Sequence, residues 1–165
     1  MSQPVGYKLE AFILNHRAAE MLPDDLPHLH RFRLSDHLTL VPVTSQLLQQ
    51  VVATFGEYKA EDDPYADTFL MRLLPPLIQM AVKVSSVSAE LYIEVDAASG
   101  IGDRSAIVWH KGEAVFGPEW GGAFTTKAFT LFKQLEGLPL DQELDIYRYR
   151  FTEDWVQALE SDGDL

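Results

Sequence analysis

Acidic side chains alternate with apolar ones in a short stretch of the sequence. Glu90, Glu94 and Asp96 share the even positions with Tyr92, and residues two apart in a strand point to the same side, roughly 6.5 to 7 Å from each other. Carboxylates at that spacing can serve as general acid and base, but such a pair also needs a cleft and one raised pKa. The pattern leaves two interpretations open, a solvated strand face and an acidic recognition face.

A tryptophan in a glycine-rich segment is the best single candidate for a contact residue. Trp120 follows Glu119 within residues 117–122, which contain three glycines and a proline and therefore predict a loop. Large aromatic side chains on loops are enriched at binding hot spots. The alternative is a hydrophobic lid folded under its own loop.

Histidines gather early in the chain. His28 and His30 are two apart, and Asp36 and His37 follow, a set of nitrogen and carboxylate ligands that zinc tolerates. Arginines flank the pair, however, and no helical zinc motif is present. We therefore expect solvated or capping histidines and predict no metal, although the sequence leaves open whether His28, His30 and His37 bind one.

Two glycines, Gly100 and Gly102, raise the question of a phosphate-binding loop. A dinucleotide fingerprint needs a further small residue and then a helix, whereas the residues after Ser105 predict another strand. The chain also contains no Gly-x-Ser-x-Gly elbow and no Gly-Lys-Ser or Gly-Lys-Thr. The sequence therefore predicts a plain turn, no cofactor and no identifiable catalytic residue.

Composition excludes several classes of protein. The 165 residues carry a net charge of -12, of which residues 61–165 contribute -11, so general binding to nucleic acid or an anionic membrane is disfavoured. The absence of cysteine excludes disulfides and thiolate chemistry. The most apolar stretch, residues 69–84, is too interrupted to span a bilayer, and we predict a cytoplasmic protein.

The periodicity of apolar residues predicts an α+β fold in a single domain, residues 1–165. An antiparallel sheet with a central three-strand meander at about residues 89–117 packs against three or four helices. Thr44 or Ser45 caps one helix, another ends at Gly137, and Pro42 confines its strand to an edge of the sheet. The predicted elements are strands at 7–14, 29–34, 38–43, 89–97, 105–109, 114–116 and 143–151, and helices at 44–58, about 61–74, 77–84, 124–137 and 153–160.

From residue 32 to about 138 the sequence resembles a group of small uncharacterised bacterial proteins. The shared pattern consists of Leu40-Val41-Pro42-Val43-Thr44 before a helix, Glu94-Val95-Asp96, Ser99-Gly100-Ile101-Gly102, Val108-Trp109, Lys111-Gly112, Gly117-Pro118 and an apolar helix at Phe124 to Leu135. The chain departs from the group at Ala97, Ala98, Ser99 and Arg104, where the group shows an aromatic pair, a glycine and a glutamine. The resemblance implies an α+β fold and no particular activity.

Three functions remain open at this point. The first is a non-catalytic acidic domain, such as an immunity or inhibitor protein, that binds a basic protein partner through Glu90, Tyr92, Glu94, Asp96, Glu119 and Trp120. The second is a small enzyme or ligand-binding domain with a pocket near the histidines and the loop at 99–103. The third is a domain whose charge only confers solubility. The sequence does not specify an oligomeric state.

Overall fold

The computed structural model describes residues 8–24, 26–55, 75–96, 103–120 and 122–141. Four predicted features lie outside these residues: the helix at 61–74, the glycines at 100 and 102, the strand at 143–151 and the helix at 153–160.

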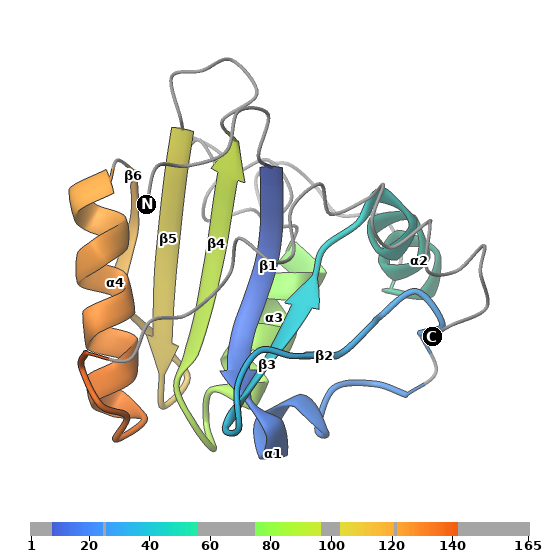
Figure 1. Cartoon of the computed structure of the whole chain (residues 1–165). Coiled ribbons are helices and arrows are strands. Elements are labelled where there is room, and N and C mark those ends of the chain that lie inside the picture. Colours follow the sequence, from blue (N-terminus) through green and yellow to red (C-terminus); the bar gives the residue numbers. More distant parts are fainter. Residues whose placement is uncertain (1–7, 25, 56–74, 97–102, 121, 142–165) are drawn as a thin grey trace.

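Within the described residues, antiparallel strands form one six-stranded sheet (Figure 1). Its strands are β1 (Lys8–Asn15), β2 (Phe32–Arg33), β3 (Leu38–Pro42), β4 (Glu90–Asp96), β5 (Asp103–His110) and β6 (Glu113–Trp120). Their order across the sheet is β2-β3-β1-β4-β5-β6. The first strand of the chain is therefore central, and β4, β5 and β6 form the predicted meander. The α+β prediction is confirmed.

Helices cover both faces of this sheet. The short helix α1 (His16–Ala19), α2 (Ser45–Phe55) and α3 (Pro75–Val84) contribute to the core on one face, while α4 (Gly122–Leu135) covers the other (Figure 1). None of the helices in the described segments combines the length and the apolarity that crossing a membrane requires.

Side chains alternate between the two faces of each central strand and pack into two separate cores. The first core lies between the sheet and helices α1 to α3 and includes Phe12, Tyr92 and Trp109. The second core lies between the sheet and α4 and includes Ile13 and Phe132. Because consecutive residues of β1 enter different cores, the middle of the sheet is buried on both faces.

The ends of α2 and α3 follow from their sequences. The Thr44 hydroxyl accepts a hydrogen bond from the Leu47 amide at 3.1 Å, which confirms Thr44 as the cap of α2. The helix α3 begins at Pro75 and Pro76, where a missing amide donor costs little because the first-turn amides have no helical acceptor.

The prediction that Pro42 confines its strand to an edge is wrong. The strand β3 lies between β2 and β1. Pro42 is its last residue and is paired with Ala11, whereas β2 reaches only Leu40 and Thr39. The proline is tolerated because the neighbouring strand is too short to need its amide.

Candidate functional site

The strand expected to carry the acidic contact surface is buried. Glu90 is 1% exposed, Tyr92 is 0% exposed and Glu94 is 8% exposed. The expectation that these side chains share a solvated face is wrong, because that face of β4 is turned toward the first core and helices α1 to α3 cover it. In this fold the three side chains cannot form an exposed contact surface.

The other three residues of that predicted set are described only by their backbones. Asp96 ends β4, and Glu119 and Trp120 end β6. For these three residues the structure describes the backbone alone. Trp120 is therefore part of a strand and not of the predicted loop, and its backbone is paired with Ser105 of β5. Contact between these residues and a partner stays a prediction.

The buried acids of β4 have different surroundings. The Tyr92 hydroxyl donates a hydrogen bond to Oε2 of Glu94 at 2.7 Å, and Glu10 of β1 lies directly opposite Glu94 in the sheet. Glu90, by contrast, has a buried Oε2 atom with no hydrogen-bond partner within the described chain. Burial alone raises the pKa of Glu90 well above its ordinary value.

Glu90 faces a small apolar cavity. Its volume is about 10 Å³, which is room for one water molecule at most. The side chains that line it together with Glu90 come from β1, β3, the segment after α1, and helices α2 and α3: Phe12, Leu22, Leu29, Val41, Leu47, Leu77, Met80 and Ala81. A cavity of this size and polarity is a packing feature and does not admit a ligand.

The three histidines have different neighbours in the described residues. The His28 amide donates to Oε1 of Gln50 at 3.0 Å, the His30 ring lies 6.2 Å from that of Phe32, and His37 belongs to the turn between β2 and β3. The described residues contain no group of three histidines or acids that could hold a metal ion.

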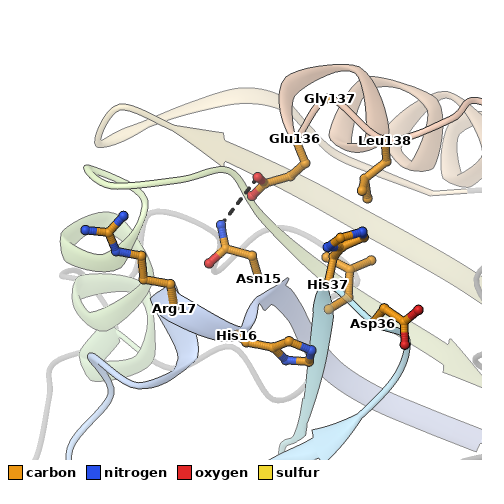
Figure 2. A pocket seen from close by; sticks show the side chains of 9 residues that line it. Asn15, His16, Arg17, Asp36, His37, Glu136, Gly137 and Leu138 are labelled. Carbon is orange, nitrogen blue, oxygen red and sulfur yellow. Dashed lines mark hydrogen bonds between the residues drawn. The ribbon is translucent and has the colours of Figure 1, made fainter.

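A larger pocket opens at the end of the sheet where β1 finishes. It has a volume of about 400 Å³, within the range of small-molecule sites. Figure 2 shows that three segments build it: the junction of β1 and α1, the turn before β3, and the end of α4. Its lining consists of Asn15, His16, Arg17, Asp36, His37, Leu38, Glu136, Gly137 and Leu138.

This pocket lies only partly where the sequence suggested one. His37 does line it, as expected for a pocket near the histidines. Residues 97–102, however, follow Asp96, which pairs with Lys8 at the start of β1, whereas the pocket lies beside Asn15 at the end of β1. The flanks of the glycine loop are therefore at the opposite end of the sheet.

Local backbone preferences place Glu136 on the pocket wall. The helix α4 ends with amides of Gly137 and Leu138 donating to the carbonyls of Gln134 and Lys133, the pattern of a Schellman cap. Gly137 adopts a φ of 67°, which explains why glycine stands there as the sequence predicted. The cap turns the chain back and leaves Glu136 beside β1.

Asn15 joins the two sides of the pocket. Its Oδ1 accepts a hydrogen bond from the Ala18 amide at 2.7 Å and thereby caps α1. This bond fixes the orientation of the amide group, so that Nδ2 points to Oε2 of Glu136 at 3.4 Å (Figure 2). The second bond is long and therefore weak.

Glu136 is a carboxyl group with unused hydrogen-bonding capacity. Ser88 and the Ala89 amide lie near it, but Oε1 has no hydrogen-bond partner in the described residues. Burial raises the pKa of Glu136, and the donors Asn15, Ala89 and Ser88 and the charge of His110 offset only part of this rise. The carboxyl would gain from a further donor or a cation.

His16 is a structural part of the pocket. Its Nε2 lies 3.1 Å from the Ser35 carbonyl, which can only accept, so Nε2 carries a proton. Its Nδ1 lies 2.6 Å from the Thr39 hydroxyl. Both ring nitrogens are engaged, which holds the turn before β3 against α1 and leaves His16 poorly suited to transfer protons.

The sequence did not reveal Asn15, Arg17 and Glu136 as site residues. Asn15 and Glu136 are 121 positions apart. From the sequence, each could be placed only at the end of a predicted strand or helix. The available signal was local: an asparagine between a strand and a helical turn, and an acid directly before the helix-ending Gly137. Nothing in either segment indicated the other.

No family model, curated protein or solved structure matches this chain. The functional argument therefore depends on the geometry of the pocket.

Proposed function

We propose that this chain is a binding domain for a small polar molecule, which it takes into the pocket around Glu136. The observation that carries the proposal is an under-satisfied carboxyl group on the wall of a cavity of about 400 Å³. Buried polar atoms are nearly always hydrogen-bonded in folded proteins. A ligand that donates to this carboxyl would remove the deficit once the group turns Oε1, which is buried in the free protein, toward the pocket.

The remaining pocket residues favour binding over catalysis. Asp36 forms an ion pair with Arg33, and both nitrogens of His16 have partners. Among the described residues, the carboxyl of Glu136 has Asn15, Ser88 and the Ala89 amide as its hydrogen-bonding neighbours, and none of these groups is an acid or a base. The arrangement supports recognition of a polar ligand without turnover.

The test is a screen of small polar molecules by amide chemical shifts in nuclear magnetic resonance. We expect ligands to shift the amides of Arg17, His37 and Gly137 and to bind less tightly to Glu136→Gln. Glu20→Gln is the matched control, because Glu20 is exposed and does not line the pocket. Hits that bind elsewhere, or that bind equally to Glu136→Gln, would contradict the proposal.

An acidic immunity or inhibitor protein is the second proposal, and the charge of -12 favours it. Its contact set is reduced to Asp96, Glu119 and Trp120, because Glu90, Tyr92 and Glu94 are buried. Binding to a basic protein encoded by a neighbouring gene should weaken steeply between low and high salt. Binding that is insensitive to salt would argue against this function.

A further inference from the structure

The lining of the pocket includes two groups of opposite charge, Arg17 and Glu136. In Figure 2 Asn15 lies between Arg17 and Glu136. The Arg17 side chain is exposed and has no hydrogen bond or ion pair with the described chain. In this view the guanidinium of Arg17 and the carboxyl of Glu136 lie on either side of the Asn15 amide. Each of the two charged groups can form a further hydrogen bond.

The other end of the pocket is less polar. Leu38 and Leu138 contribute to its lining, and both also belong to the second core or pack against it. Figure 2 shows His37 beside Leu138, away from the Arg17 end. A ligand that fits this arrangement carries both charges at one end and an apolar group at the other.

We propose that the ligand is an α-amino acid with an apolar side chain, or a molecule that presents the same groups, with its ammonium on Glu136 and its carboxylate on Arg17. This inference rests on the proposed function. Oε1 is buried in the free protein, so the carboxyl group of Glu136 rotates to bring this oxygen to the ammonium, which then supplies the missing donor. The apolar side chain lies toward Leu38 and Leu138.

A zwitterion fits better than a singly charged ligand. A lone cation would leave Arg17 unmatched, and a lone anion would meet the carboxyl of Glu136 in a protein of charge -12. Asp36 does not offer a second anionic anchor, because it is paired with Arg33. Charge-assisted hydrogen bonds at both ends of the pair set the selectivity.

The experiment compares leucine with two probes that each lack one charge, leucinamide and N-acetylleucine, by chemical-shift titration near pH 7. We expect each probe to bind about tenfold more weakly than leucine, the effect of losing one charge-assisted hydrogen bond. If leucine and a probe bind equally, the charged group that the probe lacks is not recognised, and the inference is overturned for that group. Chemical-shift changes confined to the pocket residues would still support the proposed function.

Variants assign the two charges to their residues. Arg17→Gln should weaken leucine and N-acetylleucine but not leucinamide, and Glu136→Gln should weaken leucine and leucinamide but not N-acetylleucine. Lys83→Gln, a change at an exposed position of α3 that does not line the pocket, should leave all three affinities unchanged. If Glu136→Gln does not fold, Glu136→Asp keeps the charge and should retain the order of the probes. Uniform weakening of all probes by either pocket variant would overturn the assignment.

If neither these probes nor the wider screen shifts the pocket amides, the proposed function fails together with the inference. If the screen finds polar ligands in the pocket but leucine is not preferred over its probes, only the inference fails.

Discussion

Glu90 and Glu136 are two carboxyl groups whose pKa burial raises, yet their surroundings differ in kind. Glu90 is enclosed by apolar side chains under α3, beside a cavity of about 10 Å³. Glu136 is half-buried at an open pocket of about 400 Å³, with several donors nearby. The comparison teaches that a raised pKa marks a binding site only where a ligand has room to reach the group.

The largest expected difference between the two regions is in packing. Phe12→Ala should lower the free energy of unfolding by about 3–5 kcal/mol, because the Phe12 ring lies 4.8 Å from the Tyr92 ring and 6.3 Å from that of Trp109. Leu138→Ala at the half-buried pocket wall should cost less. Urea denaturation followed by tryptophan fluorescence measures both, and equal losses would remove the contrast.

The second prediction concerns the charge of Glu90. Because burial raises the pKa of Glu90 in the folded state above its value in the unfolded chain, the folded protein holds the proton more tightly. Stability should therefore fall as pH rises through the interval between these two pKa values. The lining of the cavity contains no other titratable side chain among the described residues.

Glu90→Met should accordingly raise the free energy of unfolding at pH 8 by about 1–3 kcal/mol, the penalty of an unsatisfied buried polar group. The gain should shrink toward pH 4. Glu90→Gln removes the charge but keeps a polar amide, so its gain should be smaller. A loss of stability in Glu90→Met at pH 8 would show that the carboxyl has a partner in the folded protein.

The third prediction separates the two roles of Asn15. Asn15→Ala removes both the cap of α1 and the donor to Glu136, and should cost about 1 kcal/mol. Asn15→Asp keeps an oxygen that caps α1 but puts a second carboxylate beside Glu136. Both variants should raise the pKa of Glu136, and Asn15→Asp should raise it more. Carboxyl carbon shifts followed over pH measure this directly, and an unchanged pKa in both variants would break the link between the residues.

The smallest effect is expected for Glu136→Gln. Burial raises the pKa of Glu136 as well. Glu136→Gln, like Glu90→Met, should therefore raise the free energy of unfolding at pH 8. This gain should stay below about 1 kcal/mol, because solvent screens a half-exposed group. A gain as large as that of Glu90→Met would mean that the pocket is closed.

Within the described residues, local patterns predicted most of the elements but not their surroundings. The cap at Thr44 and the end of α4 at Gly137 depend on neighbouring residues and could be predicted. The polar positions of β4 were predicted to face solvent, because alternation is typical of a sheet with one wet face. Here helices cover both faces, and that fact depends on how distant segments pack.

The candidate site was hidden for the same reason. Asn15 and Glu136 meet because β1 is central in the sheet and the end of α4 comes near the end of β1. The topology of the sheet places them together, and no local pattern encodes it. Trp120 shows the converse error, because the glycines around it suggested a loop where pairing with β5 makes a strand.

The central claim is that Glu136, and not Glu90, is open to a ligand. The most direct test is to follow the carboxyl carbons of both residues over pH, with and without leucine. We expect the pKa of each to be raised in the free protein, and leucine to lower that of Glu136 alone, because a nearby ammonium favours the carboxylate. The account would be contradicted if neither leucine nor any ligand found in the screen changed the pKa of Glu136 at saturation. It would also be contradicted if the pKa of Glu90 responded equally.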